Sequence, residues 1–169
     1  MGYLLGTKMQ QTFWLRDAKI AGRTGPNNHP WNIQAFVEHG FSAIISVNDA
    51  ADVDATKIRS SGLAYAHIPM SDNAPAEPGD LEYCLEQLPK AIAFIQQHSQ
   101  TGPVLVHCRL GQDRTGMVLA ACLVAFEKLS PQQAMDEVWR VRPTAFGATD
   151  WVNFVPEVLS LFAQQNTSL

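Results

Sequence analysis

Residues 104–117, VLVHCRLGQDRTGM, place one cysteine and one arginine in a short loop between two apolar segments. The apolar run at the start of this stretch predicts a buried strand that ends at Cys108. Arg114 lies six positions further on, with Gly111 between the two. From residue 115 to residue 128 the sequence is apolar nearly all round, which predicts a helix buried on several sides. The stretch therefore predicts a strand, a glycine- and arginine-containing loop, and a buried helix.

Strands and helices alternate along the chain around this unit. Two short strands are expected within 12–22, on either side of a turn at Arg16–Asp17, and further strands at 43–47, 63–69 and 103–107. Helices are expected at 31–39, 52–61, 81–98, 115–128, 131–140 and from 149 or 150 to 164. This alternation predicts an α/β fold with a central, largely parallel sheet covered by helices on both faces. Ligands of such sheets bind at the carboxyl ends of the strands, where Cys108 is placed.

The chain length and the apolar content describe an ordinary globular protein. The 169 residues, 46% of them hydrophobic, predict a single domain over 1–169, with flexible ends at 1–12 and 165–169. No apolar run reaches the roughly 18 residues of a membrane span. A formal net charge of −4 and a pI near 5.7 argue against a nucleic-acid partner. Oligomeric state is left open by these features.

Three cysteines, Cys84, Cys108 and Cys122, are present, and no two of them are spaced as a metal or redox motif. A disulfide framework is therefore not expected, and a reducing, cytoplasmic location is the better prediction. Cys84 and Cys122 are interpreted as core residues on helix faces. For Cys108 the spacing to the following glycines and arginine is too specific for that interpretation.

The loop that follows Cys108 has the composition of an anion site. Backbone N–H groups at the start of a helix have no partner within the helix and lie at its positive end. Gly111 permits a close backbone turn, and the planar guanidinium of Arg114 matches two phosphate oxygens. A phosphate- or sulfate-like anion would be bound by Arg109, Leu110, Gly111, Gln112, Asp113 and Arg114. A nucleotide-binding P-loop is excluded, because Met117 stands where that motif has lysine.

The same loop would activate the cysteine. A thiol beside an arginine and a helix N-terminus loses its proton well below its usual pKa, which makes Cys108 a candidate nucleophile. The hydroxyl of Thr115 could donate a hydrogen bond to the sulfur and make it a better leaving group. His107 is interpreted as a residue that orients the loop through hydrogen bonds, since the thiol needs no separate base.

The segment HCRLGQDRTG resembles the His-Cys-x5-Arg signature of the cysteine-dependent protein tyrosine phosphatase superfamily. FWLRDAKIAG, AIISVND, AYAHIPMSD and RVRP resemble further elements of its small, dual-specificity branch, so that residues 13–154 follow one pattern. The resemblance implies a phosphatase fold with the active-site loop between the last strand and a buried helix. It also implies hydrolysis of phosphate monoesters through a cysteinyl-phosphate intermediate, with no metal and no cofactor.

The leaving oxygen of a phosphate ester needs a proton, and the resemblance places the acid just after the strand that precedes the long helix. Asp72 matches that position, although an Asp at a turn start is an alternative interpretation. Asp113 is a second candidate, since some phosphoinositide phosphatases carry Asp-Arg-Thr here. We favour Asp72, because a carboxylate aimed at a phosphate dianion is repelled, and Asp113 is expected to tie the loop in place instead. Asp80 is expected to cap the helix that begins near residue 81.

The substrate class is predicted from the loop and from the resemblance. Phosphotyrosine, with phosphoserine and phosphothreonine, is the leading class, and a phosphorylated protein or small phosphate ester is the expected partner. Arg109 beside the cysteine keeps a phosphoinositide or inositol phosphate as the alternative, although Gln112 stands where lipid phosphatases often have a second basic residue. The resemblance also implies that one of Arg140 and Arg142 supports the loop. Arg23 could reach a substrate or lie on the surface.

Two other functions use a similar loop. A rhodanese-like sulfurtransferase also has a loop cysteine, but an Arg-Thr-Gly sequence after the cysteine loop is not expected there. A non-catalytic phosphate-binding module would lack the cysteine or the arginine, and both Cys108 and Arg114 are present.

Overall fold

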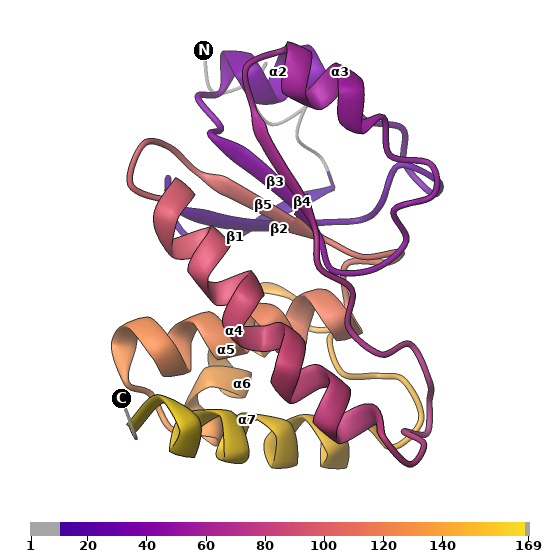
Figure 1. Cartoon of the computed structure of the whole chain (residues 1–169), viewed down its shortest axis with the longest axis vertical. Helices are drawn as coiled ribbons and strands as arrows, with labels where there is room; N and C mark the ends of the chain where they lie inside the picture. Colours follow the sequence, from indigo (N-terminus) through magenta and orange to yellow (C-terminus); the bar gives the residue numbers. More distant parts are fainter. Residues whose placement is uncertain (1–10, 168–169) are drawn as a thin grey trace.

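The computed structural model describes residues 11–167 and places a five-stranded sheet between two groups of helices (Figure 1). The strands are β1 (Thr12–Arg16), β2 (Ile20–Arg23), β3 (Ala43–Ser46), β4 (Ala64–His67) and β5 (Val104–His107). Their order in the sheet is β1-β2-β5-β3-β4. Only the β1–β2 pair is antiparallel, and the other three pairs are parallel. The prediction of an α/β fold with a largely parallel sheet is confirmed.

Helices cover both faces of this sheet. On one face lie α2 (Ile33–Glu38) and α3 (Ala55–Ser60), and on the other lie α4 (Asp80–His98), α5 (Asp113–Glu127), α6 (Pro131–Val141) and α7 (Trp151–Thr167) (Figure 1). Each helix and strand lies where the hydrophobic pattern predicted it, with boundaries shifted by a few residues. Strands β3 and β5 are buried along their whole length, because both of their faces are covered.

The central helix α5 is buried nearly all round, as its apolar sequence predicted. It packs against α4, α6 and α7 as well as the sheet. It begins at Asp113, two residues before the predicted start. Arg114 and Thr115 therefore belong to its first turn, and the loop that joins β5 to α5 contains only residues 108–112. This short connection holds the cysteine at the carboxyl end of the sheet and at the N-terminus of a buried helix.

The start of α4 differs from the prediction. Gly79 is the N-cap, with a positive φ of 95°, and Asp80 is the first residue of the helix. The Asp80 carboxylate accepts hydrogen bonds from the Glu77 backbone N–H at 2.6 Å and from the Asn73 side chain. The expectation that Asp80 is the N-cap is wrong. Its carboxylate folds back onto the preceding loop, where these hydrogen bonds lower its pKa.

Part of the segments predicted to be flexible ends, 1–12 and 165–169, lies within the described residues. Thr12 begins β1, and residues 165–167 belong to the last turn of α7. The rest of the expected flexible ends, 1–10 and 168–169, lies outside the described residues.

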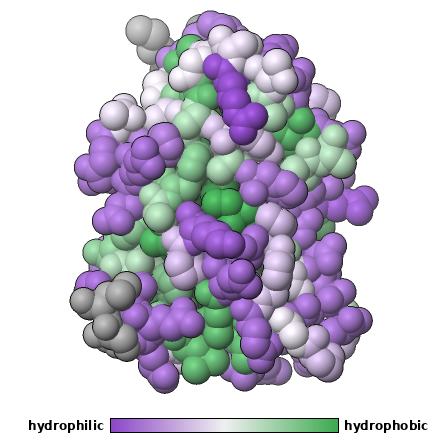
Figure 2. Space-filling model, viewed as in Figure 1, coloured by the Kyte–Doolittle hydropathy of each residue, from purple (hydrophilic) through white to green (hydrophobic). Residues whose placement is uncertain are grey.

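The face seen in Figure 2 mixes hydrophilic and hydrophobic residues, with apolar surface visible near its centre and lower part. Within 11–167, no helix has both the length and the apolar character that a membrane crossing requires. Three large apolar side chains are exposed in this range, Tyr83, Leu110 and Val152. Leu110, 47% exposed, lies in the loop after the cysteine.

Candidate active site

Cys108 lies one residue beyond β5, at the carboxyl edge of the sheet, and only 1% of its surface is exposed. The loop that follows it turns back into α5. The carbonyl group of Cys108 accepts a hydrogen bond from Nδ1 of His107 at 3.0 Å. The next carbonyl, that of Arg109, accepts two hydrogen bonds at 3.0 Å, from the Gly25 backbone N–H and from Nδ2 of Asn28. The first half of the loop is thus held from its outer side by β5 and by the segment after β2.

The second half of the loop is held by Arg142, the residue that ends α6. Its Nη2 donates to the carbonyl oxygen of Leu110 at 2.7 Å, and its Nε donates to that of Gly111 at 3.1 Å. The hydroxyl of Thr24 also points at the Leu110 carbonyl, at 3.5 Å. Arginine suits this position because its planar fork donates two parallel hydrogen bonds.

Four successive carbonyl groups, those of residues 108–111, therefore point to the outside of the loop. In a trans peptide unit the N–H points opposite to the C=O. The N–H groups of residues 109–112 consequently point to the inner side, where the N-terminus of α5 adds the positive end of its dipole. This arrangement has the geometry of an anion cradle built from backbone alone.

Glycine is required at two places where β2 and its following segment touch the loop. Gly111 has a φ of +66°, and a Cβ atom there would lie 2.6 Å from the carbonyl oxygen of Arg23. A Cβ atom on Gly25 would lie 2.6 Å from the carbonyl oxygen of Cys108. Both distances are shorter than a side chain permits, so the sequence can bring these two backbones together only with glycine.

The His107 ring belongs to a chain of hydrogen bonds that crosses three strands. A carbonyl oxygen only accepts hydrogen bonds, so Nδ1 of His107 carries a proton and donates it in the hydrogen bond to the Cys108 carbonyl oxygen. In the neutral ring Nε2 must then accept, from the hydroxyl of Ser46 at 2.5 Å, and Ser46 in turn accepts from the hydroxyl of Tyr65 at 2.6 Å. The ring is fully buried, and the Trp31 ring packs edge-on against it at 4.5 Å. Burial, together with the nearby charges of other residues, lowers the pKa of His107 to about 4. A neutral, fixed ring agrees with the orienting role predicted for it.

Arg114 connects the cysteine loop with the segment that follows β4. Its Nη2 donates to the carbonyl oxygen of Asp72 at 2.6 Å, and its Nε donates to that of Ser71 at 3.3 Å. The guanidinium lies 5.4 Å from the ring centre of Trp151, which itself donates to the carbonyl oxygen of Asn73 at 2.9 Å. A guanidinium has five N–H groups, so these two hydrogen bonds leave others for an anion.

The two candidate acids lie in different surroundings. Asp72 is exposed, and its carboxyl group makes no hydrogen bond or ion pair within 11–167. Asp113 is 8% exposed, and its Oδ1 accepts the backbone N–H of Ala148 at 3.4 Å. The structure therefore places the Asp72 backbone against Arg114 and ties Asp113 to the connection between α6 and α7, as expected for the loop-tying role.

Thr115 is buried, and its hydroxyl has no hydrogen-bond partner in the described part of the chain. A buried hydroxyl without a partner is unusual, and this one remains available as a hydrogen-bond donor in the first turn of α5. The other two cysteines, Cys84 and Cys122, are buried, and burial raises the pKa of both thiols. Their surroundings are those of core residues, as expected.

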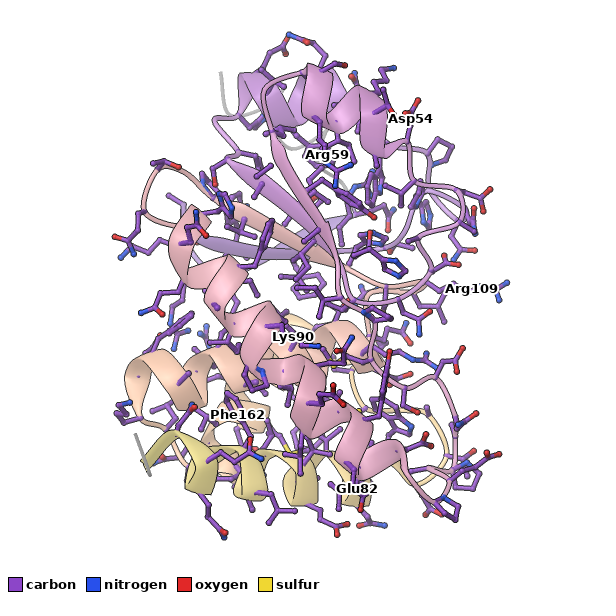
Figure 3. The ribbon with its side chains drawn as sticks, viewed as in Figure 1. Asp54, Arg59, Glu82, Lys90, Arg109 and Phe162 are labelled. Carbon is purple, nitrogen blue, oxygen red and sulfur yellow. The ribbon has the colours of Figure 1, made fainter. Side chains whose placement is uncertain are left out.

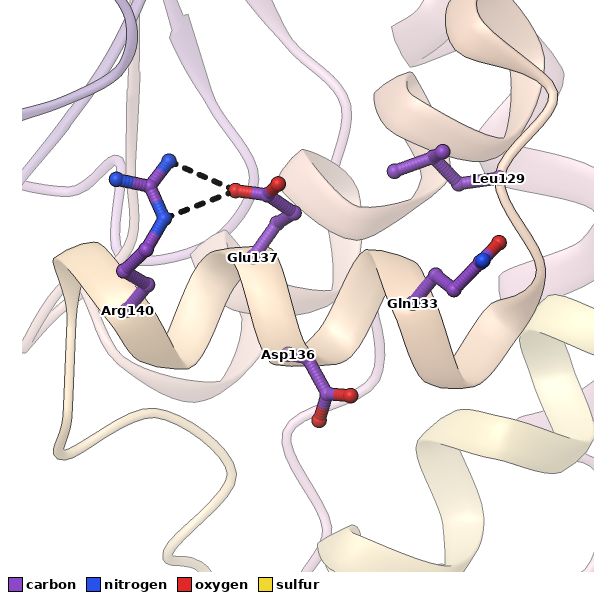
Figure 4. Close-up of a pocket in the computed structure, with 5 residues that line it drawn as sticks. All are labelled: Leu129, Gln133, Asp136, Glu137 and Arg140. Atoms are coloured by element: carbon purple, nitrogen blue, oxygen red, sulfur yellow. Dashed lines mark hydrogen bonds and ion pairs between the residues drawn. The ribbon is translucent and has the colours of Figure 1, made fainter.

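The choice between Arg140 and Arg142 is settled by geometry. Arg140 forms an ion pair with Glu137 at 2.7 Å, on the outer surface of α6 (Figure 4). These two residues line a shallow pocket with Leu129, Gln133 and Asp136. Arg142 is the residue that supports the loop. Burial lowers its pKa, whereas the nearby charge of Cys108 raises it.

Two further arginines stand near the loop. The side chain of Arg109 extends away from the body of the molecule (Figure 3). It is exposed, as Leu110 is, whereas Gln112 is half-buried at the N-cap of α5. Arg23 is only 6% exposed, so the expectation that it could be a surface residue is wrong.

Sequence reasoning missed several supports of the loop. Gly25, Asn28 and Trp31 come from the segment after β2, and Ser46 and Tyr65 from β3 and β4. The segment GRTGPNN was recognised as a loop rich in glycine and asparagine. No local pattern shows that it contacts residues some 80 positions later. Within residues 11–167, no three or more His, Cys, Asp or Glu side chains are grouped to hold a metal ion.

Comparison with known proteins places these features in a family. A family model described as dual specificity phosphatase, catalytic domain, matches residues 27–154, which is more than half of the chain. The chain is also 28% identical over 131 residues to a protein tyrosine phosphatase PRL-1 from Leishmania major. This alignment covers 76% of the chain and 73% of the relative.

Solved structures share the fold at lower identity. PTPMT1 in complex with PI(5)P matches with a TM-score of 0.74 and 17% identity, over 94% of this chain and 97% of that one. Tk-PTP in its active form matches with a TM-score of 0.70 and 24% identity, over 92% and 97% of the two chains. Human DUSP28 matches with a TM-score of 0.70 and 17% identity, over 93% and 95%. With its fold shared and residues 27–154 matched, this chain belongs to the dual specificity phosphatase catalytic-domain family.

Proposed function

We propose that this protein is a protein-tyrosine or dual-specificity phosphatase that hydrolyses phosphate monoesters through a phosphocysteine at Cys108. One observation carries the proposal: the N–H groups of residues 109–112 point into the loop that Cys108 begins. A thiolate at the centre of such a cradle is placed to attack a phosphorus atom held by those N–H groups. Neither a metal nor a cofactor is needed for this chemistry.

In the first step the Cys108 thiolate attacks phosphorus, so that a sulfur–phosphorus bond forms as the phosphorus–oxygen bond to the leaving group breaks. The backbone N–H groups and Arg114 stabilise the negative charge of the equatorial oxygens. Asp72, in its protonated form, donates its proton to the leaving oxygen. Its place in an exposed loop whose backbone is bound by Arg114 supports this role.

In the second step a water molecule attacks the phosphocysteine. The Asp72 carboxylate accepts a proton from this water, the sulfur–phosphorus bond breaks, and inorganic phosphate leaves. The departing sulfur becomes a thiolate again and is stabilised by the free hydroxyl of Thr115. His107 holds the first peptide of the loop throughout, and Asp113 holds the loop against the segment before α7.

The substrates are phosphorylated proteins or small phosphate esters, with phosphotyrosine as the leading class and phosphoserine and phosphothreonine included. A phosphoinositide or inositol phosphate is the second candidate. The observation that favours it is the exposed side chain of Arg109 beside the cysteine (Figure 3). The cytoplasm is the compartment that fits three cysteines without a disulfide.

Kinetics with p-nitrophenyl phosphate test the nucleophile. Cys108→Ser is expected to lower kcat by at least about a thousandfold, whereas Cys122→Ser, which changes a core thiol, serves as the matched control. Hydrolysis at the parent rate by Cys108→Ser would contradict the proposal. Thiosulfate:cyanide sulfurtransferase activity above the phosphatase activity would favour the rhodanese-like alternative instead.

A second pair of variants tests the acid. Asp72→Asn is expected to lower kcat at least about tenfold for substrates with poor leaving groups and less for activated ones. Asp113→Asn is the comparison, and a larger, leaving-group-dependent loss in that variant would assign the acid to Asp113. Phosphotyrosine and phosphothreonine peptides and a soluble phosphoinositide, assayed with the same variants, separate the two substrate classes.

A further inference from the structure

Arg23 is a buried cation with no counter-ion. It ends β2, is 6% exposed, and its Nε and Nη1 atoms are buried without a hydrogen-bond partner. None of the ion pairs in the described part of the chain includes it. Among the described residues, the Phe36 ring lies 5.9 Å from the guanidinium carbon. Burial of an unpaired charge is costly, and it lowers the pKa of this guanidinium.

The position of Arg23 relates it to the catalytic loop. In the parallel pairing of β2 with β5, Arg23 stands opposite His107, the residue before the cysteine. Its carbonyl oxygen also lies 2.6 Å from the point where a Cβ atom of Gly111 would stand. The Arg23 backbone therefore lies beside the last residue of β5 and against the middle of the loop. Its side chain lies on the α2 face of the sheet, whereas Cys108 belongs to the core on the α5 face.

The anion nearest in the fold to this unpaired cation is the one that the loop on the other side of the sheet would hold. Neighbouring strands are about 4.8 Å apart, so the Arg23 backbone is directly beside that of His107, and the charge of Arg23 acts on the His107 ring. We propose that Arg23 is a positioning residue whose buried charge favours the thiolate form of Cys108 and the bound phosphate dianion, and disfavours a charged His107. The inference rests on the proposed function only in taking Cys108 as the reactive thiol.

Other charged or titratable groups lie around the cysteine loop and the strand ends beside it. They are Arg114 and Asp113 from α5, Arg142 from the end of α6, Asp72 from the segment after β4, Asp49 from the segment after β3, and His107 and His67 from β5 and β4. Arg114, Arg142 and Asp72 are at least partly exposed, so solvent screens them. Arg23 is screened least, because it is nine-tenths buried. Its charge is among the causes that lower the pKa of His107, after burial and the charge of His67.

The test uses the full chain and two uncharged variants, Arg23→Met and Arg23→Gln. Methionine fills the space beside Phe36, and glutamine keeps N–H donors without the charge. Arg140→Gln, which removes a guanidinium from the exposed side of α6, is the matched control. The measurement is the rate at which iodoacetamide, a neutral reagent, alkylates Cys108 as a function of pH, with the modified peptide identified by mass spectrometry.

The pH midpoint of alkylation is expected to rise by up to about one unit in both Arg23 variants, because removal of a buried positive charge disfavours the thiolate. The control is expected to keep the parent midpoint. If the pH midpoint of Cys108 alkylation in both Arg23 variants equals that of the parent protein, the proposal is wrong. A parent midpoint in Arg23→Gln alone would also overturn it, because hydrogen bonding rather than charge would then be the cause.

Thermal unfolding supplies a second, independent readout. Arg23→Met is expected to unfold at the parent temperature or above, since it removes an unpaired buried charge. Added inorganic phosphate is expected to raise the unfolding temperature of the parent more than that of either Arg23 variant. Equal phosphate shifts in all three proteins would contradict the proposed effect on the bound dianion. None of these readouts requires turnover, so failure of the proposed phosphatase reaction is distinguishable from failure of this inference.

Discussion

Single residues shape the active site of this protein by fixing the direction of one peptide group. His107 does so for the peptide after Cys108, and Gly25 with Asn28 for the peptide after Arg109. Each turns a carbonyl outward and so directs the next N–H inward. Each of these donors binds a backbone carbonyl oxygen. The strength of such a hydrogen bond depends on the position of the donor to within tenths of an ångström.

Substitution of Gly111 tests how closely the loop and β2 are packed. Gly111→Ala is expected to lower the free energy of unfolding by more than the roughly 1–2 kcal/mol of a positive φ, because the new Cβ atom meets the Arg23 backbone at 2.6 Å. kcat/KM for p-nitrophenyl phosphate is expected to fall with it.

Gly40→Ala is the matched control for this change. Gly40 also has a positive φ, of 79°, but nothing lies within 4 Å of its Cβ position. Urea denaturation of both variants separates backbone strain from the clash. If Gly111→Ala and Gly40→Ala lose the same free energy of unfolding, the Arg23 backbone moves away from the new Cβ atom of residue 111 without an energetic cost.

At the scale of elements, α6 brings a side chain to the loop from a distant part of the chain. Ser130 and Gln133 form a capping box at its start, and Pro131 occupies its first turn. These caps fix where the helix begins, and Pro143 limits it at the other end, because the residue before a proline disfavours the helical conformation. That residue is Arg142, whose backbone N–H donates to the Val138 carbonyl oxygen at 2.7 Å. The helix is thus a spacer of defined length between its caps and the catalytic loop.

Arg142→Lys is expected to lower kcat/KM about tenfold or more, because an ammonium cannot donate to two carbonyls in parallel as the planar guanidinium does. The free energy of unfolding is expected to fall by about 1–3 kcal/mol, the cost of a lost hydrogen bond to a partly buried group. Steady-state kinetics and thermal unfolding are the measurements. Arg140→Lys, two positions earlier and paired only with Glu137, is the control. A similar loss of activity in both variants would show that α6 itself, rather than the hydrogen bonds of Arg142, is affected.

On the scale of the whole molecule, the parallel strands end together in a row of polar residues. Arg23, His107, Ser46 and His67 are opposite one another in β2, β5, β3 and β4. Parallel pairing places strand ends at one edge, so residues from four parts of the chain meet beside Cys108. Solvent does not reach the centre of this row, since His107 and Ser46 are fully buried.

The buried His107 makes the stability of the whole protein depend on pH. Its pKa is about 4 in the folded protein, below the ordinary value of 6.5. As pH falls below 6.5, His107 gains a proton in the unfolded chain but not in the folded protein. The stabilisation of the folded protein by the neutral ring is therefore present above pH 6.5 and is lost as pH falls toward 4. The loss in the free energy of unfolding is expected to reach about 3 kcal/mol.

Urea denaturation across this pH range checks the prediction. His107→Asn is expected to flatten the dependence, whereas His29→Asn, which changes an exposed histidine, is expected to keep it. An unchanged pH dependence in His107→Asn would assign the effect to other groups.

The order of helices and strands, the parallel sheet and the cysteine loop could be predicted from sequence because their signals are local. Hydrophobic periodicity marked α4 and α5, glycine marked the end of α2, and the spacing from Cys108 to Arg114 marked the loop. Prediction was wrong for the N-cap of α4, where Gly79 rather than Asp80 takes the cap. It also left open whether Arg140 or Arg142 supports the loop, since both lie near the end of one helix.

The amino-acid pattern alone was enough to predict a cysteine at a strand end before a buried helix, because apolar patterns and loop composition act over a few residues. The folded structure was needed to show that Arg142 holds the loop, that Asp113 accepts a hydrogen bond from Ala148, and that Arg23 is buried beside His107. These outcomes depend on which backbone groups meet across the sheet edge. Such contacts join residues tens of positions apart, and they are fixed by strand pairing and helix packing rather than by any neighbour in the chain.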